Sequence, residues 1–211
     1  MAPRFILLFL ICILPFTNSS AQNFEGKIIY SNKYKSKTTT MPDDQFTFMM
    51  GTTQEFSIKG GDYKSSLNGK LVQWQIYINQ DNKLYTKMSN VSSILWKDAS
   101  ISDNEVLTSE INKDVIEILG YRCDELVLTC KSGIQKFYFN STLKVDPALF
   151  ANHKFLNWNE VMSKSSARPL KIILDTPQFD LESIAVEIKP LVLDKALFEL
   201  PADSKLEKSP Y

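Results

Sequence analysis

The stretch VQWQIYIN, residues 72–79, decides the fold class because a large apolar side chain occupies every second position. Side chains of a β-strand point alternately to its two faces, so one face is predicted to hold Val72, Trp74, Ile76 and Ile78. The intervening Gln73 and Gln75 are predicted to lie on the opposite, solvated face. One apolar and one wet face are typical of a strand in an antiparallel sheet.

The same alternation recurs near both ends of the chain, over residues 24–30 and 184–188. Asn68-Gly69 predicts a tight hairpin, because both residues tolerate a positive φ. Gly60-Gly61 interrupts another strand-like run and predicts a bulge or bend that curves the sheet. We therefore expect a mainly β fold with short helices, built on a single curved antiparallel sheet of about eight to eleven strands.

Helix is expected in one late segment of the chain. Asp146-Pro147 has the pattern of a cap followed by proline at the first helical position. Asn157 and Glu160 have the spacing of a cap for a second short helix. Strand is then expected to resume after Pro169.

Residues 1–21 have the pattern of a cleaved signal peptide. Arg4 precedes the apolar run FILLFLICILPF, and small Ser19 and Ala21 follow at the positions that a signal peptidase recognises. The run is too short to span about 30 Å of hydrocarbon, so no transmembrane span is expected after cleavage. We expect an exported protein of the periplasm or the extracellular space, with residues 22–211 as a single β-rich domain.

Charge and cysteine content narrow the possible partners. Residues 22–211, which exclude Arg4, contain 23 basic and 24 acidic residues. A net charge this close to zero gives no attraction for nucleic acid. Cys123 and Cys130 lie on one continuous predicted strand, which would hold their Cα atoms about 23 Å apart. A disulfide needs a Cα separation of about 6 Å, so we expect two unpaired, mostly buried thiols.

Recognisable catalytic and metal-binding motifs are absent from the sequence. His153 is the only histidine, which excludes sites that need two imidazoles, and its place after a short helix predicts a surface or helix-end role. No cofactor and no metal are expected. Asp43-Asp44 and Glu182 keep a carboxylate-dependent hydrolase open as an alternative, although a solvated turn explains the first pair. Asn90 and Asn140 begin glycosylation sequons, which matter only in a eukaryotic secretory pathway.

Large apolar side chains are predicted to converge on one side of the sheet. They would form either an ordinary filled core or a partly open cavity for an acyl chain or a peptide. The candidate lining residues are Phe56, Ile58, Val72, Trp74, Ile76, Ile78, Trp96 and Trp158.

Four short motifs, taken in order, resemble a known group of proteins: FEGKIIY at residues 24–30, ILGYRC at 118–123, KFYF at 136–139 and LFELP at 197–201. Together they are similar to exported proteins of Bacteroidetes-type bacteria in a domain family of unknown function. That family is similar in architecture to the periplasmic lipoprotein localisation (Lol-type) carriers. The resemblance implies a half-open barrel with helices on its concave side. In the carriers the cavity holds acyl chains. The particular arginine on which they rely is matched by neither Arg122 nor Arg168.

The function expected from these observations is non-enzymatic binding of a hydrophobic ligand, a lipid or a lipidated partner, in the concavity of the sheet. A structural or protein-interaction module of the cell envelope with a filled core is the first alternative. The hydrolase is the second.

Overall fold

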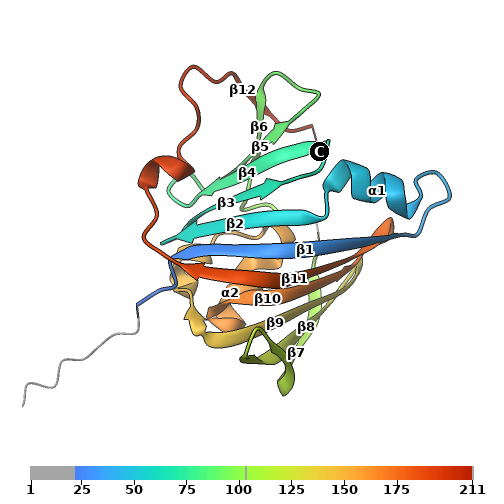
Figure 1. The fold of residues 1–211 in the computed structure, drawn as a ribbon, viewed down its shortest axis with the longest axis vertical. Helices are drawn as coiled ribbons and strands as arrows, with labels where there is room; N and C mark the ends of the chain where they lie inside the picture. Colours follow the sequence, from blue (N-terminus) through green and yellow to red (C-terminus); the bar gives the residue numbers. More distant parts are fainter. Residues whose placement is uncertain (1–21, 103, 211) are drawn as a thin grey trace, which may run out of the picture.

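The computed structural model describes residues 22–102 and 104–210, so the predicted signal peptide lies outside the described residues. These residues form one 12-stranded sheet (Figure 1). The strands are β1 (Gly26–Ser36), β2 (Thr53–Lys59), β3 (Asp62–Leu67), β4 (Val72–Ile78), β5 (Lys83–Met88), β6 (Ile94–Asp98), β7 (Val106–Ile118), β8 (Tyr121–Cys130), β9 (Gly133–Lys144), β10 (Ala167–Asp175), β11 (Phe179–Pro190) and β12 (Leu206–Lys208).

Two antiparallel meanders meet at β1, in the strand order β12-β6-β5-β4-β3-β2-β1-β11-β10-β9-β8-β7. Strand β1 pairs with β2 on one side and with β11 on the other, which joins the two ends of the chain inside the sheet. Strand β12 runs parallel to β6, and the other pairings are antiparallel. The mainly β, antiparallel prediction is confirmed. The sheet is longer than expected because β12, at the C-terminal end, adds an edge strand.

The helical elements are short: α1 (Asp43–Met50), η1 (Pro147–Phe150), η2 (Phe155–Asn157), α2 (Trp158–Ser165) and η3 (Lys195–Phe198). Asp146 caps η1 as predicted, since its Oδ1 accepts a hydrogen bond from the Ala148 N–H at 2.9 Å. Asn157 precedes α2 as predicted but makes no side-chain cap bond. Its amide instead donates to Gln135 Oε1 at 3.1 Å.

Helix α1 was not expected, because Asp43-Asp44 after Pro42 resembles a polar turn. The helix forms because one apolar residue anchors it. Phe46 is buried, and its ring centroid lies 5.1 Å from that of Phe179. The helix ends at Met50 and is capped by Gly51, which has a φ of 88°.

Both faces of the sheet are partly covered by the chain itself. On one face, α2 packs against β8, β9 and β10 (Figure 1). Elsewhere, η3 contacts β3 and β4 and buries Phe198. Strand β4 therefore has buried side chains of opposite orientation in Ile76 and Tyr77, each 1% exposed. The more apolar face of a strand is thus no guide to which face lines a cavity.

Candidate ligand-binding cavity

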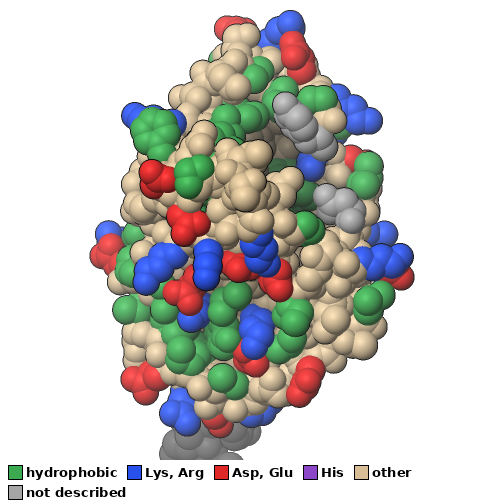
Figure 2. Space-filling view, turned by 90° about the vertical axis from the view of Figure 1, so that its right-hand side faces the viewer, with side chains coloured by type: hydrophobic (Ala, Val, Ile, Leu, Met, Phe, Trp, Pro, Cys, Tyr) green, Lys and Arg blue, Asp and Glu red, His purple; other side chains and the backbone are tan. Residues whose placement is uncertain are grey.

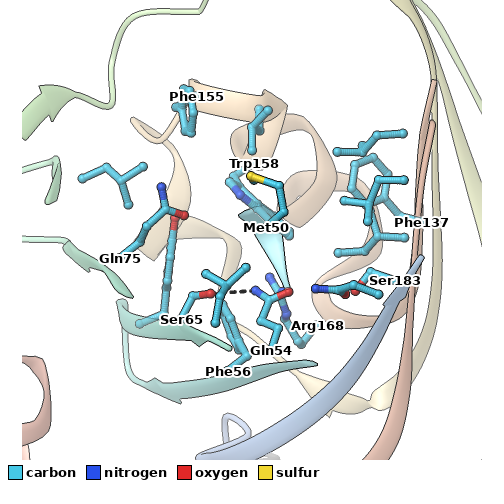
Figure 3. Close-up of a pocket in the computed structure, with 18 of the residues that line it drawn as sticks. Met50, Gln54, Phe56, Ser65, Gln75, Phe137, Phe155, Trp158, Arg168 and Ser183 are labelled. Atoms are coloured by element: carbon cyan, nitrogen blue, oxygen red, sulfur yellow. Dashed lines mark hydrogen bonds between the residues drawn. The ribbon is translucent and has the colours of Figure 1, made fainter. Parts of the chain in front are cut away.

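A cavity of ≈ 210 Å³ lies where the two meanders face each other. Aromatic and aliphatic side chains from β2, β9, β10, η2 and α2 form much of its wall, together with Met50 at the end of α1. Figure 2 shows the molecule hollowed on the side that faces right in Figure 1. The polar lining residues are Asn32, Gln54, Ser65, Gln75, Arg168 and Ser183. All of these except Asn32 are labelled in Figure 3. No Asp or Glu belongs to the described lining.

Two of the eight predicted lining residues, Phe56 and Trp158, do line this cavity. They come from β2 and from the first turn of α2. Ile58 is instead packed in the core at 1% exposure. The five predicted residues on β4 and β6 do not line the cavity in the described structure: Val72, Trp74, Ile76, Ile78 and Trp96.

The prediction for β4 was wrong about which face lines the cavity. Gln75 lines it and pairs in register with Ser65, another lining residue. Trp74 and Ile76, adjacent to Gln75 on the strand, therefore point to the opposite face. That face is buried in part because η3 contacts β4. Apolar burial and cavity lining are thus on different sides of this strand.

Arg168 is the one charged residue of the described lining, and it is 3% exposed. It is the second residue of β10, a strand that begins directly after Ser166, the left-handed residue that caps the C-terminal end of α2. The next residue, Pro169, has no N–H for the sheet, and the β9–β10 register shifts on both sides of it. This irregular strand start lies where helix and sheet meet, and it carries the guanidinium into the cavity (Figure 3).

Aromatic rings hold the guanidinium in place. Its Cζ lies 3.6 Å from the ring centroid of Phe56 and 4.5 Å from that of Trp158. Arg168 Nε donates to the Tyr30 hydroxyl at 3.2 Å, and that hydroxyl donates in turn to the Pro169 carbonyl at 2.7 Å. Burial raises the pKa of Tyr30, so this phenol stays protonated.

The polar floor of the cavity comes from β1, β2 and β3. Gln54 donates its side-chain amide to the Ser65 hydroxyl at 2.7 Å, as the dashed line in Figure 3 marks. Asn32 is 3% exposed, and its Oδ1 has no hydrogen-bond partner among the described residues. A buried acceptor without a donor carries a desolvation cost of about 1–3 kcal/mol.

His153 does not have the surface role expected of it. It is 0% exposed, and its Nε2 lies 2.9 Å from the hydroxyl of Tyr63. Its ring lies 4.1 Å from the Tyr77 centroid, and Phe150 stacks nearby. Burial lowers the pKa of His153 to about 3, with a smaller contribution from the charge of Arg168, so the imidazole is neutral. This aromatic stack packs beside the cavity through Tyr63.

A second, smaller hollow of ≈ 150 Å³ lies on the β6 side of the cavity. The two spaces share Gln75, Leu84 and Phe155 as lining residues. Leu95 and Met88 extend the apolar wall of the second hollow. The two hollows therefore lie next to each other, with Arg168 in the wall of the larger one.

The carboxylates considered for hydrolysis are not part of this region. Asp43 and Asp44 are exposed at the start of α1. Glu182 forms an ion pair with Lys171 at 2.9 Å. Across residues 22–102 and 104–210, no group of three or more His, Cys, Asp or Glu residues is arranged to hold a metal ion. In the same ranges no helix is both long and apolar enough to cross a membrane. Cys123 and Cys130 are both free and buried, as predicted.

Sequence reasoning missed Arg168, Asn32 and Gln54 as lining residues. The available signal was weak: Arg168 is one of two arginines after the signal peptide, and it stands next to apolar Ala167 and Pro169.

No protein-family model matches the chain, and no curated protein matches it. Among solved structures, the chain is similar to a structure of PNGF-II with a TM-score of 0.49 and 12% sequence identity. The match covers 88% of this chain and 32% of that one. A likeness at this level carries no argument about fold or function.

Proposed function

We propose that this protein binds a hydrophobic ligand, a lipid or the acyl chain of a lipidated partner, between the two halves of its sheet. The observation that carries the proposal is the ≈ 210 Å³ cavity with its largely apolar wall. An apolar cavity of roughly 150 Å³ is large enough to admit a benzene-sized ligand. The neighbouring hollow toward β6 offers room for the rest of a flexible chain.

The proposal includes the cellular setting expected from the sequence. An exported protein of the periplasm or extracellular space would meet lipids and lipidated proteins there. The resemblance in architecture to the Lol-type carriers, whose cavity holds acyl chains, supports the same function. We further propose that the face contacted by α2 is the concave side of a half-open barrel. No catalytic step is part of this proposal.

A fluorescent fatty acid, cis-parinaric acid, tests the proposal directly. We expect saturable binding with micromolar affinity, equivalent to about −8 kcal/mol. Burial of an acyl chain contributes about 0.8 kcal/mol per methylene, from which association and ordering costs are subtracted. If the probe shows no saturable binding even at concentrations well above micromolar, the interaction module with a filled core becomes the better hypothesis.

Ser183 offers a matched pair of variants. It is 4% exposed on β11, and its side chain lines the cavity (Figure 3). Ser183→Phe would fill part of the space with a ring, so probe affinity should fall at least tenfold. Ser183→Ala removes only a hydroxyl and should leave affinity within about twofold. Equal affinity for the two variants would place the probe elsewhere on the protein.

A further inference from the structure

Arg168 places a positive charge in a cavity whose other described lining residues are neutral. The residue as a whole is only 3% exposed. No ion pair of the described residues includes Arg168. A buried charge without a counter-charge is destabilising, so its presence calls for a compensating group.

The protein provides hydrogen-bond acceptors for only some of the N–H groups of Arg168. Phe56 and Trp158 offer the faces of their rings, which attract the cation but leave the in-plane N–H groups without acceptors. Tyr30 accepts from Nε, and no protein acceptor bonds the terminal amino groups among the described residues. Those amino groups belong to the planar, fork-shaped set of N–H donors by which a guanidinium pairs with the two oxygens of a carboxylate.

To this space Asn32 adds a second polar atom without a partner in the part of the chain that the structure describes, an acceptor that a donor such as water would satisfy and a carboxylate would not. Its Oδ1 is buried in the cavity wall without a donor among the described residues. A cavity that bound only hydrocarbon would leave both the Arg168 cation and the Asn32 acceptor without partners, and buried polar groups are normally paired.

Resting on the proposed function, we propose that the ligand is a single-chain acyl amphiphile with a carboxylate head, and that Arg168 binds this carboxylate. One guanidinium matches one negative charge, which favours a carboxylate over a doubly charged phosphate monoester. The tail then lies against Leu84 and Phe155 and extends into the second hollow. The aromatic rings and Tyr30 preorganise the guanidinium before the ligand arrives.

Displacement of cis-parinaric acid by three amphiphiles of equal chain length tests the head group. We expect dodecanoate to bind the wild-type protein at least tenfold more tightly than dodecanol. We also expect dodecanoate to bind more tightly than dodecyl phosphate. Equal affinity for dodecanoate and dodecanol would overturn the proposal, and a clear preference for dodecyl phosphate would replace the carboxylate with a phosphate head.

Two arginine variants assign the preference to its residue. Arg168→Met keeps an apolar stem of similar length, so the ratio of dodecanol to dodecanoate Kd should fall to within about twofold of one. Arg122→Met is the matched control, because the Arg122 side chain is 64% exposed and lies outside the cavity lining. Its ratio should equal that of the wild type. An unchanged preference in Arg168→Met would overturn the assignment.

Failure of this inference is distinguishable from failure of the proposed function. Binding of dodecanol and dodecanoate with equal affinity would retain a hydrophobic cavity and remove the anion site. Absence of binding by any of the amphiphiles would remove both. Should Arg168→Met fail to fold, the wild-type series remains decisive, and Arg168→Lys keeps the charge while losing the paired geometry of the fork.

Discussion

Protonation of His153 is predicted to destabilise the folded protein, because the imidazole is buried where a charge has no partner. The ring is 0% exposed and stacks among Tyr63, Tyr77 and Phe150. Nδ1 has no hydrogen-bond partner among the described residues, and Arg168 adds a repulsive positive charge. Burial lowers the pKa of His153 from 6.5 to about 3 in the folded state.

The sign and size of the effect follow from proton linkage. Between pH 6.5 and about pH 3 the unfolded chain holds a proton on His153 that the folded chain lacks. Stability is therefore fully present above pH 6.5 and is lost as the pH falls toward the folded pKa. Between pH 7 and pH 5 the loss is about 2 kcal/mol from this one group. The window lies above the range where ordinary carboxylates take up most of their protons.

Urea denaturation followed by tryptophan fluorescence at pH 7 and pH 5 measures this loss, with His153→Gln as the control. The variant keeps a polar side chain but has no group that titrates in the window, so its loss should be about 2 kcal/mol smaller. Since His153 is the only histidine of the untagged chain, its NMR resonance also reports the pKa directly. A ring that titrates near pH 6.5 in the folded protein, or equal losses in both proteins, would refute the reasoning.

Two further predictions concern the backbone and the thiols. Gly26→Ala should cost at least about 2 kcal/mol more in unfolding free energy than Gly60→Ala. Both glycines have positive φ, but a Cβ at Gly26 would lie 2.2 Å from the Lys189 carbonyl oxygen, whereas one at Gly60 would meet open space. Equal midpoints in urea would contradict this. Cys123 and Cys130 should react with a thiol reagent only in denaturant, giving two thiols per mature chain, because both are buried and burial raises the pKa of Cys123 to about 11. Rapid labelling of the native protein would show that one of them is accessible.

The strand class was predictable because period-two alternation depends on local geometry alone. The sequence predicted where the chain turns more reliably than it predicted the kind of turn. Gly60-Gly61 was expected to form a bulge or bend within one strand-like run, and it instead separates β2 from β3, which pair as a hairpin. Gly60 supplies the left-handed φ of 58° that the tight reversal uses. The helix α1 was missed because its anchor, Phe46, packs on Phe179 from the far end of the chain.

The orientation of β4 was not predictable from its own sequence. Alternation separates Trp74 and Ile76 from Gln75, but it does not say which set faces the cavity. The C-terminal element η3 contacts β4, so large side chains are buried away from the cavity as well as toward it. Polar Gln75 then lines the cavity beside Ser65.

Arg168 shows why a binding site of this kind leaves little trace in the sequence. Its position depends on Tyr30, 138 residues earlier, and on rings from β2 and α2 that no local motif links. A stable core would be easier to build with an apolar residue at this position, since replacing a buried charge by hydrocarbon is often neutral or stabilising. The chain nevertheless buries this charge and holds it between the rings of Phe56 and Trp158. A bound anion that pairs with the Arg168 guanidinium would explain why this loss of stability is retained. The polar wall of the cavity is therefore a better guide to the ligand than the apolar wall.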